Sequence, residues 1–84
     1  MTKRDKLIQR FSSKPKDFTW NELVAMLGGL GYSKVIGGKT GGSRVRFFHQ
    51  NHPPIILHRP HPSPLLKRYQ IEQVHDLLKG EGLI

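Results

Sequence analysis

The chain has 84 residues, with 14 Lys and Arg against 6 Asp and Glu, and a formal net charge of +8. This length fits a single small domain over 1–84, and the excess of cations favours an anionic partner, either nucleic acid or an acidic protein. The absence of cysteine excludes disulfides, zinc–thiolate centres and thiol chemistry. Because no apolar run approaches the ~20 residues that span a bilayer, and because the amino terminus is charged, we expect a cytoplasmic protein with no membrane partner.

The sequence predicts a short first helix over Lys3–Phe11. Leu7, Ile8 and Phe11 fall on one face of this helix, which indicates that this face packs against the rest of the chain. A polar stretch containing a proline follows over 12–17 and predicts a break before the next element.

A second helix is predicted from the spacing of its capping residues. Thr19 and Glu22 have the capping-box spacing, and Phe18 before the cap can pack on Leu23 as a hydrophobic staple. The expected buried stripe of this helix is Trp20, Leu23, Val24, Leu27 and Leu30.

Three glycines mark the end of the second helix. Gly31 suits the left-handed conformation that commonly stops a helix. Gly28 and Gly29 weaken the last turn by roughly 1 kcal/mol each relative to alanine. We expect another stretch of backbone to approach closely there.

Three strand-like runs follow, over 32–36, 43–49 and 54–59. A glycine-rich connection over 37–42 separates the first two runs. A short turn over 50–53 joins the last two, which therefore predict an antiparallel hairpin.

A final helix is predicted after the sheet. Pro60 and Pro62 end the third strand, because proline cannot donate to a ladder. Ser63 is the expected cap with Pro64 in the first helical position, and Gly80 closes the helix. Its expected apolar face is Ile71, Val74, Leu77 and Leu78. The order α-α-β-β-β-α predicts an α+β fold of two layers, in which helices cover one face of a three-stranded antiparallel sheet.

The middle of the chain carries positive charge without any carboxylate. From Leu23 to Ile71 there is no Asp or Glu. The seven cations of this span are Lys34, Lys39, Arg44, Arg46, Arg59, Lys67 and Arg68. Because a domain usually intersperses its charges for solubility, this concentration of one sign indicates a surface for an anion.

Alternation along the second strand predicts which side its cations face. Val45 and Phe47 point one way, whereas Arg44, Arg46 and Phe48 point the other. If the helices cover Val45 and Phe47, the open face presents two arginines beside an aromatic ring, a pattern suited to phosphates and exposed bases. The alternative is a sheet face that is merely solvated.

The third strand adds a histidine to this open face. Burial of Ile55 and Leu57 would place Ile56 and His58 beside the arginines. The continuous apolar run over 55–57 leaves the opposite orientation open.

Lys67 and Arg68 lie in the expected first turn of the last helix, where the helix dipole disfavours cations. A phosphate bound at that turn would offset the dipole, because free backbone N–H groups point the same way. Simple tolerance of two exposed charges is the alternative.

Together these features resemble the HicA family of toxins, over Thr19 to about Leu78. The residues that carry the resemblance are Gly41-Gly42-Ser43, Arg46-Phe47-Phe48-His49, Pro60-His61 and the apolar face of the last helix. HicA proteins are small basic ribonucleases of type II toxin–antitoxin systems, with a fold like the double-stranded RNA-binding domain. The resemblance therefore implies an mRNA interferase whose core covers 18–80, with an extra N-terminal helix and linker over 1–17.

The resemblance also implies a partner and an RNA surface. The partner is an acidic HicB-like antitoxin, which would cover the basic face and the histidines. The expected RNA-binding residues are Lys39, Arg44, Arg46, Arg59, Lys67 and Arg68. Arg44 stands where the family places its catalytic histidine. Either another histidine has taken the role, or this branch binds RNA with altered or no catalysis.

Cleavage of RNA without a metal needs a base for the 2′-hydroxyl, an acid for the leaving 5′-oxygen and a cation on the phosphate. Histidine, with an ordinary pKa of about 6.5, suits the first two roles, and arginine suits the third. Because His58 can share the open face with Arg44, these two form the preferred catalytic pair. His61 is the alternative base and matches a histidine common in the family. His49 is third, because its parity places it on the side of Phe47.

The remaining residues favour other roles. His52 lies in the turn and is expected to be a surface residue, whereas a structural role is expected for His75 on the last helix. No cofactor or metal is expected: Mg²⁺ prefers carboxylate ligands, which the central stretch lacks, and a histidine site for zinc or nickel is a remote alternative. The rival functions are a non-catalytic RNA-binding module and a protein–protein module for an acidic partner.

Overall fold

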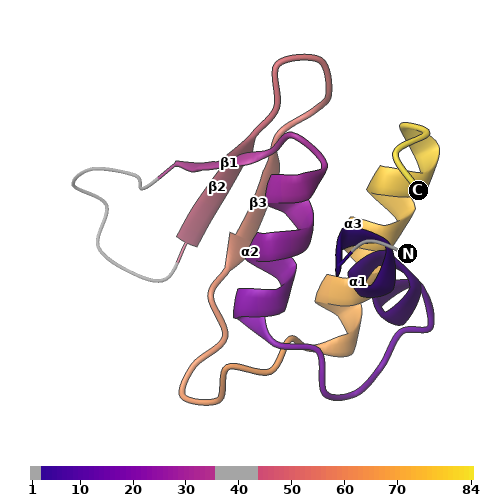
Figure 1. Ribbon diagram of the computed structural model, residues 1–84. Coiled ribbons are helices and arrows are strands. Elements are labelled where there is room, and N and C mark those ends of the chain that lie inside the picture. The colour runs from indigo at the N-terminus through magenta and orange to yellow at the C-terminus, as the bar shows by residue number, and fades with distance from the viewer. Residues whose placement is uncertain (1–2, 36–43) are drawn as a thin grey trace.

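The computed structural model describes residues 3–35 and 44–84, and it has the predicted α+β architecture (Figure 1). The elements are α1 (Lys3–Ser12), α2 (Trp20–Gly29), β1 (Ser33–Val35), β2 (Arg44–Phe48), β3 (Ile55–His58) and α3 (Arg68–Gly80). The strands form one antiparallel sheet in the order β1-β2-β3, and the three helices lie on one side of it. No helix of this described part is long and apolar enough to cross a membrane.

Helix α1 is packed into the same core as the rest of the chain. The Phe11 side chain is fully buried, and its ring centroid lies 5.2 Å from that of Phe18. The Arg10 guanidinium reaches from α1 to both Glu22 and Asp17, and its Nη2 lies 2.8 Å from Asp17 Oδ1. The predicted first helix is confirmed, and these contacts fasten it to the start of α2.

The capping box at the start of α2 is confirmed. The Glu22 backbone N–H donates to Thr19 Oγ1 at 3.2 Å, and the Thr19 N–H donates to Glu22 Oε1 at 3.0 Å. Burial opposes ionisation of Glu22, but the hydrogen bonds from Thr19 and Arg10 outweigh it and hold the pKa of this carboxyl below its ordinary value of 4.5.

The end of α2 confirms one glycine prediction and corrects another. Gly31 has φ +99°, the left-handed conformation expected after a helix. At Gly29 the three atoms nearest to the Cβ position belong to the side chain of Arg4 and not to backbone, and Arg4 Nη1 donates to the Gly29 carbonyl at 3.0 Å. Nothing lies within 4 Å of the Cβ position of Gly28, so the predicted close approach is wrong at that residue.

Helix α3 starts later than predicted, at Arg68. The segment before it is extended, because it pairs with the chain that leads into α2. Trp20 N–H donates to the Pro64 carbonyl at 2.8 Å, and Leu66 N–H donates to the Phe18 carbonyl at 2.9 Å. This long-range pairing overrides the local Ser-Pro signal, so the predicted cap at residue 63 is wrong.

One apolar core lies between the helices and the sheet. Its residues are Phe11, Phe18, Trp20, Leu23, Met26, Leu27, Tyr32, Phe47, Ile55, Leu57, Leu66, Ile71, Val74 and Leu78. Val24, Leu30 and Leu77 are partly buried at its edge, and Met26 is a core residue that the sequence analysis missed. Because Phe47, Ile55 and Leu57 face this core, the other face of the sheet is left uncovered.

Candidate nucleic-acid interface

The uncovered face of the sheet holds the predicted arginines and His58. The antiparallel register pairs Arg44 with His58 and Arg46 with Ile56. All four side chains are exposed, whereas Phe47, the residue after Arg46 on β2, is buried. The predicted orientation of both strands is therefore confirmed. We call the surface formed by Val35, Arg44, Arg46, Phe48, Ile56 and His58 the open sheet face.

The open sheet face combines positive charge with exposed apolar area. The three strands contain no Asp or Glu. Val35, Phe48 and Ile56 are 43%, 50% and 41% exposed, although they are large hydrophobic residues. Large exposed apolar residues beside uncompensated cations are typical of an interaction surface.

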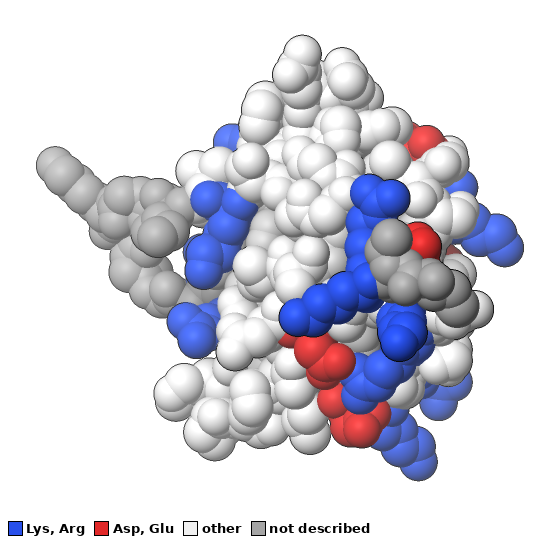
Figure 2. Space-filling model, in the orientation of Figure 1, with Lys and Arg blue, Asp and Glu red and all other residues white. Residues whose placement is uncertain are grey.

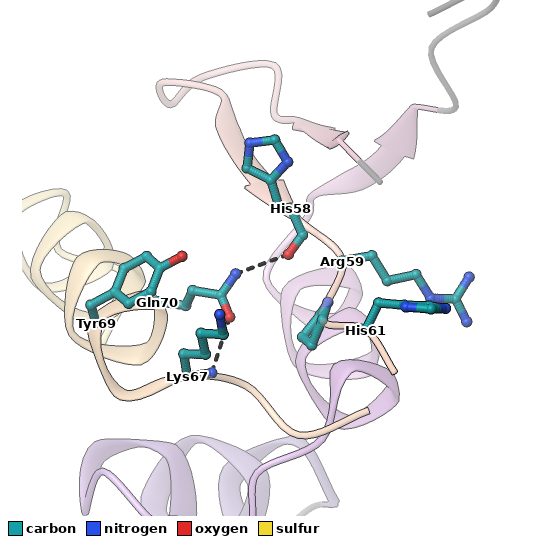
Figure 3. A pocket seen from close by; sticks show the side chains of 7 residues that line it. His58, Arg59, His61, Lys67, Tyr69 and Gln70 are labelled. Atoms are coloured by element: carbon teal, nitrogen blue, oxygen red, sulfur yellow. Dashed lines mark hydrogen bonds between the residues drawn. The ribbon is translucent and has the colours of Figure 1, made fainter. Parts of the chain in front are cut away.

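The end of β3 is held in place by a buried amide on α3. Gln70 is only 3% exposed, and its Nε2 donates to the His58 carbonyl oxygen at 2.9 Å (Figure 3). Its Oε1 accepts the Lys67 backbone N–H at 3.0 Å. Sequence reasoning missed this residue. The one available signal was the capping-box spacing of Lys67 and Gln70, which lacks the usual Ser or Thr.

The two candidate histidines point in different directions. In Figure 3 the His58 ring points away from Arg59 and His61, whereas the side chains of Arg59 and His61 extend together. Neither imidazole has a hydrogen-bond partner within residues 3–35 and 44–84. The structure thus brings His58 to Arg44 and His61 to Arg59, and it does not bring the two histidines together.

Two hollows flank the segment that follows β3. The first, which we call the α3 hollow, has a volume of about 310 Å³ and is lined by His58, Arg59, Pro60, His61, Lys67, Tyr69 and Gln70. The second, the α2 hollow, measures about 260 Å³ and is lined by Trp20, Asn21, Arg59, Pro60, His61, Pro62 and Pro64. The three residues common to both linings form a shared rim.

The other histidines make structural contacts. His49 Nδ1 accepts the Asn51 N–H at 2.9 Å, so its Nε2 carries the proton and donates to the Leu30 carbonyl at 3.1 Å. His52, expected to be a surface residue, lies 2.8 Å from Glu81 Oε1. The centroid of the His75 ring lies 6.1 Å from that of the Phe11 ring.

The predicted RNA-binding cations differ in their surroundings. Lys39 lies outside the described residues. Arg44, Arg46, Arg59 and Lys67 have no ion pair within the described ranges. Arg68 Nε lies 3.1 Å from Glu72 Oε1, but its side chain remains 82% exposed.

A further group of cations lies over α1. Figure 2 shows blue side chains on the right, over α1, with red carboxylates among them. On the same face of the molecule, the blue side chains at the left have no red side chain beside them.

In the part of the chain that the structure describes, no three side chains of the metal-binding types His, Asp or Glu gather into one cluster.

A protein-family model matches most of the chain. No curated protein and no solved structure matches the chain. The model of the HicA toxin family, from bacterial toxin–antitoxin systems, matches residues 20–80. This range covers the sheet, α2, α3 and both hollows. Because the match extends over well more than half of the chain, the protein belongs to the HicA family, the toxins of bacterial toxin–antitoxin systems.

Proposed function

We propose that this toxin is an RNA-binding endoribonuclease that cleaves mRNA without a metal, with His58 and Arg44 as its catalytic pair. The observation that carries the proposal is their direct pairing across β2 and β3 on the open sheet face. Side chains of directly opposite residues start about 4.5–5.5 Å apart at Cβ, so an imidazole and a guanidinium can flank one phosphate.

The chemistry uses the 2′-hydroxyl of the RNA as the nucleophile. His58 takes the proton from this hydroxyl as its oxygen attacks the neighbouring phosphorus. The bond from phosphorus to the 5′-oxygen breaks, which leaves a 2′,3′-cyclic phosphate, and the 5′-oxygen takes up a proton from water. Arg44 stabilises the extra negative charge on the phosphate through its two-pronged guanidinium.

Gln70 acts as a positioning residue for this pair. It holds the His58 carbonyl oxygen from α3 and so fixes the strand end that carries the imidazole. The alternative pair is His61 with Arg59, because their side chains also extend together. Each pair holds one potential base and one cation for the phosphate.

An acidic HicB-like antitoxin would inhibit the toxin by covering the open sheet face. Carboxylates of such a partner would meet Arg44 and Arg46, and its apolar side chains would cover Val35, Phe48 and Ile56. This coverage would block RNA from His58 by direct occlusion.

One observation favours a second candidate function. Arg44 occupies the position where the HicA family places its catalytic histidine, so the protein could be an RNA-binding module without nuclease activity. A purely protein-binding module is the third possibility, since a basic apolar face also suits an acidic partner alone.

Cleavage assays in EDTA test the proposal. We expect purified toxin, free of antitoxin, to cut single-stranded mRNA, and His58→Ala and Arg44→Ala each to abolish cutting while thermal unfolding stays unchanged. His52→Ala is the matched histidine control, because its ring contacts Glu81 outside the open sheet face. Loss of cutting in His61→Ala alone would move the catalytic role to His61 and Arg59.

Binding assays separate the rival functions. RNA binding that weakens steeply with salt, with no cleavage by the wild type, would establish the non-catalytic module instead. A failure to bind any RNA at low salt would contradict both RNA functions and leave the protein-binding module.

A further inference from the structure

The α3 hollow has the size and lining of a small ligand site. Its volume of about 310 Å³ lies at the lower end of the range of small-molecule clefts, which is roughly 300–1,000 Å³. The lining contains Arg59 and Lys67 and no carboxylate. An anionic ligand with a flat group of moderate size would fit this combination.

The ring of Tyr69 gives the α3 hollow a flat aromatic surface. This side chain is 59% exposed although it is a large aromatic residue, and it makes no ring contact within the described ranges. Its hydroxyl points inward over the hollow in Figure 3. Proteins use exposed aromatic rings near cations to stack unpaired bases.

Hydrogen bonds connect the two sides of the α3 hollow before any ligand binds. Gln70 joins the start of α3 to the end of β3 through its bonds to the Lys67 N–H and the His58 carbonyl. The site is therefore already formed before a ligand binds. Binding then costs less conformational entropy of the protein.

We propose that the α3 hollow binds one unpaired base of single-stranded RNA, stacked on Tyr69, with the adjacent phosphates on Lys67 and Arg59. This inference rests on the RNA binding proposed above and specifies the form of RNA that is bound. A duplex keeps its bases stacked inside the helix and cannot offer one to the hollow. The carboxylates of an acidic peptide would pair with Arg59 and Lys67, but they would not stack on the Tyr69 ring.

The α2 hollow provides a place for the neighbouring nucleotide. It shares Arg59, Pro60 and His61 with the α3 hollow, and Asn21 adds an exposed amide for the edge of a base. A strand that fills both hollows passes its linking phosphate over the shared rim. The same strand thereby brings a phosphate to Arg59 and His61.

The test measures binding and does not depend on cleavage. The probes are a short single-stranded RNA with 2′-methoxy groups, which cannot undergo attack by the 2′-hydroxyl, the same strand with its bases removed, and a duplex. We expect the wild type to bind the intact strand more tightly than the other two. Tyr69→Ala should weaken binding of the intact strand by roughly 5- to 150-fold, the range of one lost base stack.

Matched variants separate stacking from charge and from folding. Tyr69→Phe keeps the ring and should bind within about twofold of the wild type, as expected for stacking on a π-face. Lys67→Gln should lower the salt dependence of binding, whereas Lys79→Gln, at the other end of α3, should not. Thermal unfolding should be the same for all four variants, because both lysines and Tyr69 are exposed.

Three results would overturn the inference. The first is equal binding of the intact and the abasic strand by the wild type. The second is an unchanged affinity in Tyr69→Ala while RNA still binds elsewhere, which would leave the proposed nuclease function standing. The third is a Tyr69→Ala defect that affects only binding of the antitoxin, which would make the hollow a protein interface. If the wild type binds none of the three probes, the proposed RNA function fails as well.

Discussion

Arg10 of α1 and the arginines of the open sheet face differ in what surrounds them. Arg10 contacts Asp17 and Glu22, and its guanidinium carbon lies 5.2 Å from the centre of the Phe18 ring. Arg44 and Arg46, by contrast, lie on strands that contain no carboxylate, and neither has an ion pair within the described part of the chain.

Net charge alone therefore does not locate a binding surface. On α1 the charge of Arg10 is largely cancelled nearby, so its contribution is to join two helices. On the open sheet face the charge extends into solvent, where it attracts an anion. The predictions below test this division of roles.

The largest effect should come from a pair of phenylalanines, one from each region. Phe11→Ala removes a fully buried ring of α1 and should lower the free energy of unfolding by about 3–5 kcal/mol. Phe48→Ala removes a half-exposed ring of the open sheet face and should change it by less than about 0.5 kcal/mol. Urea denaturation of both variants measures this contrast, and similar losses would refute the assignment of Phe48 to an interaction surface.

A buried amide should show the next largest effect. Gln70→Leu leaves the His58 carbonyl and the Lys67 N–H without their partner and should lower the free energy of unfolding by about 1–3 kcal/mol. Gln73→Leu, at an exposed position of the same helix, is the control and should have little effect. Because the end of β3 would loosen, Gln70→Leu should also slow RNA cleavage at a temperature where the variant is still folded.

Two arginines should separate stability from RNA affinity. Arg10→Ala should lower the Tm and leave the salt dependence of RNA binding unchanged, because its charge is already paired. Arg46→Ala should leave the Tm unchanged. It should make the plot of log RNA-binding constant against log salt concentration less steep, by about 1 in slope. The two regions would not differ as described if both variants changed the same quantity.

The smallest effect concerns pH. Because the pKa of Glu22 is lower in the folded protein than its ordinary value of 4.5, its ionised form stabilises the fold above that pH. The stabilisation should be lost as the pH falls through the lower, folded-state pKa. Urea denaturation between neutral and acidic pH should therefore show a steeper loss of stability in the wild type than in Glu22→Gln.

Local signals predicted much of this fold. The capping box of Thr19 and Glu22 and the left-handed Gly31 depend on residues only a few positions apart. The two faces of β2 and β3 follow from simple alternation, which placed Arg44 and His58 on one surface. Such features are readable because the interactions that fix them lie within one element or one hairpin.

The features that sequence reasoning missed depend on contacts between distant segments. Helix α3 starts at Arg68 because the preceding residues pair with the chain around Thr19. The same path of the chain sends His61 away from His58, although only two residues separate them. The hydrogen bond from Gln70 to the end of β3 likewise joins residues that no periodicity relates.

The burial of Phe11 limits where the chain can be truncated. The family match begins at residue 20, but the core includes Phe11 of α1. Glu22 in α2 also forms an ion pair with Arg10 of α1. A shortened chain that starts at the boundary of the match would lack both Phe11 and Phe18 and would leave a hole beside His75. For expression and for engineering, we therefore expect the smallest foldable unit of this toxin to include α1, which the family match leaves out.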